Sequence, residues 1–99
     1  MKLLEVEKKF VIVAYDIVSN KRRRRVMKCL KGMGFHVQKS VFECLLTDDQ
    51  IRRLKKLLLK EVNAEEDTIR IYVLPEGLKD EVRILGTGEV LEDRPFVVI

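Results

Sequence analysis

Residues 10–34 have the sequence FVIVAYDIVSNKRRRRVMKCLKGMG, an apolar run followed directly by a long basic stretch. β-Branched and aromatic residues fill positions 10–16 without polar alternation, which predicts a central strand covered on both faces. Ser19 or Asn20 can cap the helix that follows, and Gly34 is its expected stop. The stretch therefore predicts a strand followed by a helix, and the remaining elements decide the fold.

The rest of the chain predicts three further strands and a second helix. Residues 35–46 are expected to be extended, with a turn at Lys39 and Ser40. A capping box at residues 47–50 begins a helix with an apolar stripe, and residues 68–74 alternate as a strand does. This order predicts an α+β, ferredoxin-like βαββαβ sandwich, in which two helices cover one face of an antiparallel sheet.

Length limits the chain to one predicted domain, residues 1–99, with its core in about residues 10–74. In the C-terminal segment, residues 75–99, positions 81–85 can form a short strand. The chain ends on FVVI at residues 96–99. Four exposed apolar residues are rare at a terminus, so we expect them to add to a sheet edge in the same subunit or in a partner's.

Charge is distributed unevenly along the sequence. Twenty Lys and Arg against 16 Asp and Glu give a net charge of +4. Residues 18–42 contain eight cations and no acid, whereas residues 1–17 are neutral and residues 43–99 carry −4. A basic face on a near-neutral body is typical of a protein that meets phosphates. The eight cations are Lys21, Arg22, Arg23, Arg24, Arg25, Lys28, Lys31 and Lys39.

The four consecutive arginines have two interpretations, a solvated helix face or a phosphate-binding surface. Like charges at this density repel one another, and a polyanion would relieve that repulsion. The planar fork of arginine also matches phosphate oxygens. We therefore predict binding to the nucleic-acid backbone without base specificity.

Several other classes of protein and site are not supported. The longest apolar run is too short to span a membrane, and residues 1–9 lack the apolar core of a signal peptide, so a cytoplasmic chain is expected. Cys29 and Cys44 are expected to be reduced, half-buried thiols. His36 is the single histidine and is interpreted as structural; no zinc-type or nucleotide-binding motif accompanies it.

Asp16 is the candidate metal ligand, because it ends the first predicted strand just before a helix N-terminus. It could instead complement the helix dipole or cap a turn. One carboxylate is a poor magnesium site. If a two-fold axis passes near the strand end, Asp16 from each subunit, with waters and a phosphate oxygen, would make a plausible one.

Two aromatic residues flank this region. Tyr15 or Phe42 could stack on an unpaired base, or either could be buried in the core or in a dimer interface.

Taken together, these motifs resemble one family. Tyr-Asp-Ile at residues 15–17, Arg23 and Arg25 before Val26, Gly34, and QKSVFE at residues 38–43 are similar to the small CRISPR-associated endonuclease, the smaller subunit of the spacer-acquisition complex. The resemblance covers about residues 10–74 and the apolar C-terminus.

The resemblance implies a ferredoxin-like homodimer with an extra C-terminal strand that exchanges between subunits. It also implies that paired Asp16 carboxylates bind Mg²⁺ or Mn²⁺, and that the dimer hydrolyses single-stranded RNA or double-stranded DNA and bridges copies of a larger CRISPR integrase. Asp16, Arg23 and Arg25 are the implied catalytic residues. The predicted nucleic-acid-binding residues are Tyr15, Lys21, Arg22, Arg23, Arg24, Arg25, Lys28, Ser40 and Phe42.

Two alternative functions remain open. The first is a non-catalytic scaffold that holds duplex DNA in the same complex. The second is a toxin-like or regulatory ferredoxin-fold module that binds RNA or a small effector, although the aromatic residues typical of RNA-recognition sheets are missing.

Overall fold

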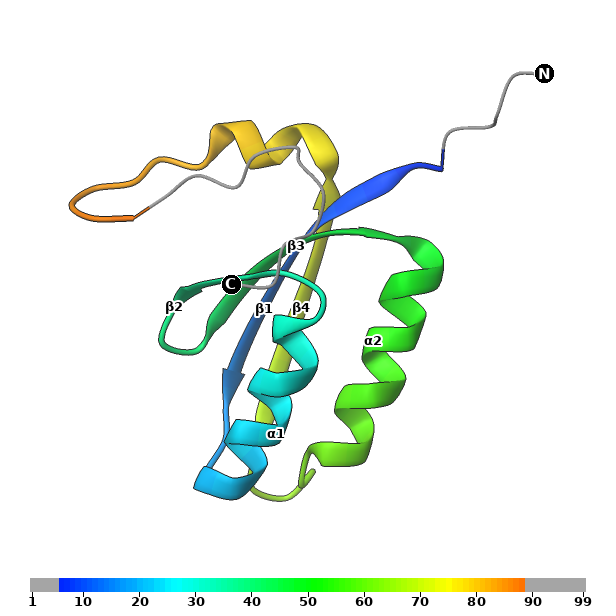
Figure 1. Ribbon diagram of the computed structural model, residues 1–99, viewed down its shortest axis with the longest axis vertical. Helices are drawn as coiled ribbons and strands as arrows, with labels where there is room; N and C mark the ends of the chain where they lie inside the picture. Colours follow the sequence, from blue (N-terminus) through cyan, green and yellow to red (C-terminus); the bar gives the residue numbers. More distant parts are fainter. Residues whose placement is uncertain (1–5, 89–99) are drawn as a thin grey trace.

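The predicted strands and helices of residues 10–75 form in the predicted order (Figure 1). The computed structural model describes residues 6–88. Its four strands form one antiparallel sheet with the order β2-β3-β1-β4. The elements are β1 (Lys8–Asp16), α1 (Asn20–Lys31), β2 (Phe35–Gln38), β3 (Val41–Thr47), α2 (Asp48–Glu61) and β4 (Thr68–Pro75).

The central position of β1 explains its unbroken apolar sequence. Alternate residues of a strand point to opposite faces of the sheet. Val11 and Val13 face the helices, whereas Phe10 lies in a second cluster on the other face. The middle of β1 is thus buried or half-buried on both faces, which explains why its sequence does not alternate with polar residues.

Both helices cover the same face of the sheet and lie against each other (Figure 1). Each presents an apolar stripe to the sheet, as its periodicity predicts. The buried residues of these stripes are Val26 and Leu30 of α1, and Ile51, Leu54 and Leu58 of α2.

The helix starts are confirmed as capped. Ser19 is the N-cap of α1, and its hydroxyl accepts a hydrogen bond from the Arg22 amide at 3.2 Å. In the capping box of α2, the Gln50 amide donates to the Thr47 hydroxyl at 3.2 Å. The Thr47 amide donates to the Gln50 side chain at 2.8 Å. These bonds satisfy amides that a helix start otherwise leaves without partners.

The expected stop at Gly34 is wrong by two residues, because α1 ends at Lys31 and Gly32 is its C-cap. Gly34 instead permits a close approach to β3. A Cβ atom at this position would lie 2.6 Å from the Glu43 carbonyl oxygen and would overlap the Cys44 sulfur. Position 34 therefore requires glycine because no side chain fits there. The backbone conformation is not the reason, since the φ angle of Gly34 is not positive.

The segment after β4 differs from the sequence expectation. Residues 81–85 do not form a strand; a 3₁₀ helix, η1 (Glu76–Glu81), follows β4 and is succeeded by irregular backbone. Val82 packs against Phe10, Phe35 and Leu45 on the helix-free face, which partly covers that cluster. The predicted strand at residues 96–99 lies outside the described residues.

Cys44 is more buried than predicted, and Cys29 is half-buried as expected. Burial raises the pKa of the Cys44 thiol to about 12, so this thiol stays protonated. Both cysteines are free. Within residues 6–88, neither helix has the length and apolar character needed to cross a membrane.

Candidate nucleic-acid and metal site at the end of β1

Asp16 is the last residue of β1 and is exposed. Its neighbour across the sheet is Thr68, the first residue of β4. Among the described residues no side-chain hydrogen bond or ion pair occupies its carboxylate. The carboxylate is therefore available to a ligand. It does not cap α1, because the N-cap of that helix is Ser19.

Asp16 fits half of a divalent-metal site. A hard cation takes six or more oxygen ligands, and sites of this kind commonly use one or two carboxylates with waters and phosphates. Residues 6–88 contain no group of three or more His, Cys, Asp or Glu side chains that could hold a metal. At the end of β1 the described residues supply one exposed carboxylate, Asp16, so a magnesium site here would need a second chain.

The Arg23 side chain folds back onto the segment that joins β1 to α1. Its guanidinium donates to the Ile17 carbonyl at 2.8 Å and also to the Asn20 side chain. Arg23 would have to give up its bond to the Ile17 carbonyl before it could hold a phosphate.

Arg25 lies on another side of α1. Its guanidinium is 3.9 Å from the Glu61 carboxylate of α2, and its side chain is exposed. Residues two apart project about 200° from each other around a helix axis, so Arg23 and Arg25 do not face one point. The structure therefore does not bring these two predicted catalytic arginines together.

Arg22 is already paired inside the molecule. Its guanidinium donates to the Asp67 carboxylate at 2.8 Å and to Glu66 at 2.8 Å. The hydrogen bonds that Arg22 donates to Asp67 and to Glu66 raise the pKa of its guanidinium. Arg22 was predicted to bind phosphate, and this pairing removes it from the free cations.

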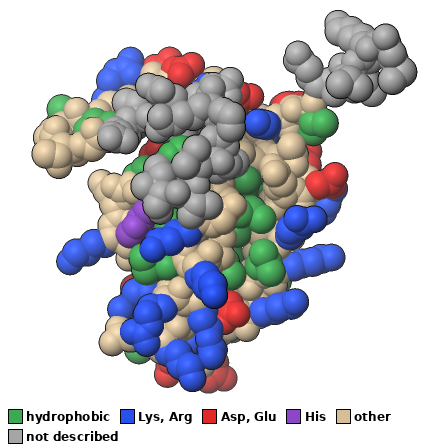
Figure 2. All heavy atoms as spheres, in the orientation of Figure 1, with side chains coloured by type: hydrophobic (Ala, Val, Ile, Leu, Met, Phe, Trp, Pro, Cys, Tyr) green, Lys and Arg blue, Asp and Glu red, His purple; other side chains and the backbone are tan. Residues whose placement is uncertain are grey.

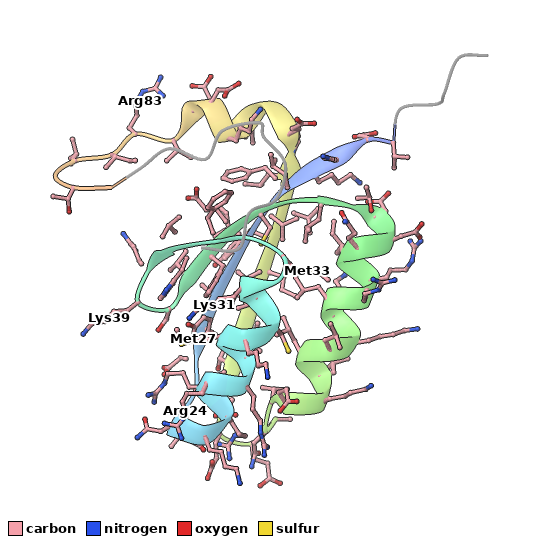
Figure 3. All side chains as sticks on the ribbon, in the orientation of Figure 1. Arg24, Met27, Lys31, Met33, Lys39 and Arg83 are labelled. Carbon is pink, nitrogen blue, oxygen red and sulfur yellow. The ribbon has the colours of Figure 1, made fainter. Side chains whose placement is uncertain are left out.

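Exposed cations form a stripe on the solvent side of α1. Figure 2 shows basic side chains over this helix, and Figure 3 shows Arg24 pointing away from its lower end. All members are exposed, and within the described chain only Arg25 has an ion-pair partner, at 3.9 Å. The members of this α1 stripe are Lys21, Arg24, Arg25, Lys28 and Lys31.

The turn between β2 and β3 closes one side of the site. The Tyr15 amide donates to the Ser40 carbonyl at 3.0 Å, and the Tyr15 hydroxyl donates to the Lys39 carbonyl at 3.2 Å. The ring nitrogen Nε2 of His36 lies 3.0 Å from the same Lys39 carbonyl. These contacts place half-buried Ser40 next to the end of β1.

Tyr15 and Phe42 were predicted to contact nucleic acid, and the structure corrects this. Tyr15 is 5% exposed and Phe42 is 0% exposed, so neither ring can stack on a base. Both point into the helix-covered cluster, where their ring centroids are 6.4 Å apart. Burial raises the pKa of Tyr15 even though the nearby Arg23 charge lowers it. His36 stacks on Phe42 from outside at 4.7 Å, a structural contact.

Sequence reasoning missed a second set of cations. With seven cations and no acid in α1, and five cations and three acids in α2, the helical layer is strongly basic. Counting charge by segment hid the α2 cations, because the acids that follow them outweigh them. The apolar stripe of α2 could have revealed them, since it leaves every cation on the solvent side: Arg52, Arg53, Lys55, Lys56 and Lys60.

Asp67 was also missed as a functional candidate. Its side chain is 0% exposed and lies between α1 and the start of β4. Hydrogen bonds, first from Arg22 and then from backbone amides, lower its pKa despite burial. The sequence gives no signal for this, because Asp67 ends an acidic cluster that is typical of an exposed loop.

Comparison with known proteins places this geometry in context. A family model described as CRISPR associated protein Cas2 matches residues 9–82. The CRISPR-associated endoribonuclease Cas2 2 of Thermodesulfovibrio yellowstonii is 42% identical over 82 residues, which cover 83% of this chain and 88% of that protein.

Solved structures agree with the sequence comparison. The crystal structure of Streptococcus pyogenes Cas2 superposes with a TM-score of 0.71 at 34% identity, covering 78% of this chain and 99% of that one. A chain of a partial Cas6-RT-Cas1–Cas2 complex superposes with a TM-score of 0.63 at 30% identity, covering 78% of this chain and 90% of that one.

Proposed function

The chain belongs to the CRISPR-associated protein Cas2 family, and from this membership we propose that it is a metal-dependent endonuclease that acts in CRISPR adaptation. The observation that carries the proposal is an exposed carboxylate, Asp16, at the strand end that leads into α1; no side chain among the described residues pairs with it. A relative named endoribonuclease supports phosphodiester hydrolysis as the reaction. Single-stranded RNA and double-stranded DNA are the proposed substrates.

The proposed metal site is shared between two chains. Asp16 from each subunit would hold one Mg²⁺ or Mn²⁺ ion. Such an ion, when bound, would stabilise negative charge that develops on the scissile phosphate. The chain itself contributes the position of Asp16 and the cations of the α1 stripe, which bind flanking phosphates.

A ferredoxin-like homodimer is part of the proposal. The face of the sheet opposite the helices is only partly covered, and Tyr72 of β4 is 44% exposed there beside half-buried Ile12. β4 is also an edge strand, which could accept a further strand. We propose that a second copy covers this face and that residues 75–99 contribute the exchanged strand.

The proposed partner is the larger CRISPR integrase. A structural neighbour is a chain of a partial Cas6-RT-Cas1–Cas2 complex, and the likeness covers 78% of this chain. In that role the α1 stripe would hold duplex DNA while the dimer bridges integrase copies. This bridging role does not itself require cleavage.

A metal titration separates the nuclease from the scaffold. Purified dimer should cleave RNA or duplex DNA as Mg²⁺ or Mn²⁺ is added, and a chelator should abolish cleavage while duplex binding persists. The measurement is product formation on labelled substrates together with a parallel binding assay. Salt-dependent duplex binding with no cleavage at any metal concentration would establish the non-catalytic scaffold instead.

Neutralising the α1 stripe tests the binding surface. A triple variant with Lys21→Gln, Arg24→Gln and Lys28→Gln should bind duplex DNA more weakly, because fewer cations on phosphates means fewer counterions released on binding. The slope of log K against log salt should become shallower by about 0.9 for each phosphate that the variant no longer neutralises. Binding titrations at several salt concentrations measure this slope.

The second helix offers a matched control. A triple variant with Arg53→Gln, Lys55→Gln and Lys56→Gln removes the same charge from α2. We expect a smaller change in slope from this variant. Equal slopes from both variants would mean that DNA is attracted by net charge alone, and the α1 stripe would no longer be the binding surface.

A further inference from the structure

Asp67 is the most heavily hydrogen-bonded side chain near the candidate site. Its carboxylate accepts from Arg22 Nε at 2.8 Å and from Arg22 Nη2 at 3.2 Å. It also accepts from the Val18 amide at 3.0 Å and from the Asn63 amide at 2.9 Å. With a side chain that is 0% exposed, this carboxylate is saturated by protein donors.

The contacts of Asp67 surround Asp16 on two sides. Val18, whose amide donates to Asp67, lies two residues after Asp16 in the segment that joins β1 to α1. Thr68, which follows Asp67, is the residue directly opposite Asp16 in the β1–β4 ladder. Asp67 therefore ties the segment after Asp16 to the strand beside Asp16.

Arg22 and Arg23 complete this arrangement from α1. Arg22 makes two hydrogen bonds to Asp67, and Arg23 donates to the Ile17 carbonyl of the segment that joins β1 to α1. The Ile17 carbonyl and the Val18 amide thus have fixed partners. Side chains from α1 and from the residue before β4 thus satisfy both backbone groups, which holds this segment in place.

We propose that Asp67 and Arg22 form a clamp that positions the Asp16 segment, so that Arg22 is a positioning residue and not a phosphate ligand. Its functional consequence rests on the proposed role of Asp16. A metal ligand held in one conformation binds its ion without a prior ordering cost. The clamp therefore sets how strongly the site binds metal, whereas the α1 stripe sets how strongly it binds nucleic acid.

The test is Asp67→Asn, which keeps the shape of the side chain and removes its charge. Arg22 donates to both carboxylate oxygens, through Nη2 to Oδ1 and through Nε to Oδ2. The carboxamide has one oxygen and one NH₂ donor group, so in either orientation a donor faces Arg22, and both the two-point contact and the charge attraction are lost. Glu66→Gln is the matched control, because Glu66 contacts the same Arg22 at 2.8 Å from the exposed side. Should Asp67→Asn fail to fold, Arg22→Lys takes its place, since it removes the two-point contact and keeps the charge.

The first readout is amide hydrogen exchange, which needs no metal and no activity. In Asp67→Asn the Val18 amide should exchange at least about tenfold faster than in the wild type, while core amides such as Val13 keep their rates. Glu66→Gln should leave Val18 unchanged. An unchanged Val18 rate, or one that rises only in step with the core amides, would overturn the clamp.

The second readout is Mn²⁺ binding, measured by titration calorimetry beside duplex-DNA binding. We expect the half-saturating Mn²⁺ concentration to rise about tenfold or more in Asp67→Asn, as is typical when a group that orients a metal ligand is removed. Duplex affinity should stay within about twofold of the wild-type value, because the cations of the α1 stripe are unchanged. Unchanged Mn²⁺ binding together with faster Val18 exchange would overturn the positioning role.

The two proposals fail in different ways. Absence of Mn²⁺ binding in the wild-type dimer would refute the metal site of the proposed function. The clamp would still be tested by the exchange rate of the Val18 amide, which needs no metal.

Discussion

Asp16→Asn should abolish metal-dependent cleavage while leaving the fold, the dimer and duplex binding intact. Asp16 is exposed and makes no hydrogen bond or ion pair with a described side chain, so its replacement removes no stabilising contact. A carboxamide oxygen is a weaker ligand for a hard cation than a carboxylate. In a dimer the substitution removes both carboxylates of the proposed site at once.

The expected loss in cleavage rate is at least on the order of 10²-fold to 10³-fold, the usual effect of removing one group that stabilises transition-state charge. This loss is measured by cleavage kinetics at saturating Mg²⁺. A duplex-binding titration on the same sample shows whether binding is retained. Glu7→Gln is a suitable control, because Glu7 is an exposed acid remote from the end of β1. Cleavage at the wild-type rate by Asp16→Asn would take Asp16 out of the mechanism.

Phe42→Ala should have the largest effect on stability. Phe42 is 0% exposed in the cluster between the helices and the sheet, and truncation there leaves a cavity. Such substitutions cost about 3–5 kcal/mol. Domains of this size are stable by only about 5–15 kcal/mol, so much of the free energy of unfolding would be lost.

Phe42→Leu distinguishes this core role from base stacking. The smaller apolar side chain should keep the domain folded and leave the affinity for single-stranded RNA at the wild-type value. A stacked ring would instead cost about 1–3 kcal/mol of binding when replaced. Urea unfolding measures the stability of the variant, and a titration with single-stranded RNA measures its affinity.

The control for Phe42 is Leu59→Ala on α2. Leu59 is 72% exposed, so its truncation should change stability by less than about 0.5 kcal/mol. If Phe42→Leu weakened RNA binding at unchanged stability, the Phe42 ring would have to contact the RNA. That result would contradict the core role that its burial indicates.

Local signals in the sequence predicted most of the fold. The unbroken apolar run of β1 predicts a central strand because only burial on both faces tolerates it. The Thr47 and Gln50 pair predicts a helix start because its hydrogen bonds span only three residues. The prediction of a strand at residues 81–85 was wrong, because the local sequence does not show whether a neighbouring strand is available to pair with it.

The site was harder to predict because its contacts are distant in sequence. Arg22 and Asp67 are 45 residues apart, and no local pattern shows that they meet. The burial of Tyr15 and Phe42 depends on which face of the sheet the helices cover. Asp16 could be singled out as a candidate from position alone, since a strand that ends on an acid before a helix places that acid where the strand leaves the sheet.

The basic helical layer also makes the molecule an electric dipole. The two helices carry twelve cations and three acids, whereas the rest of residues 6–88 carries six cations and nine acids. In the field of a polyanion such a molecule turns its helices forward before contact, which raises the rate of productive encounter at low ionic strength. The same orientation directs the helix-free face of the sheet away from the polyanion, where a second copy can dock.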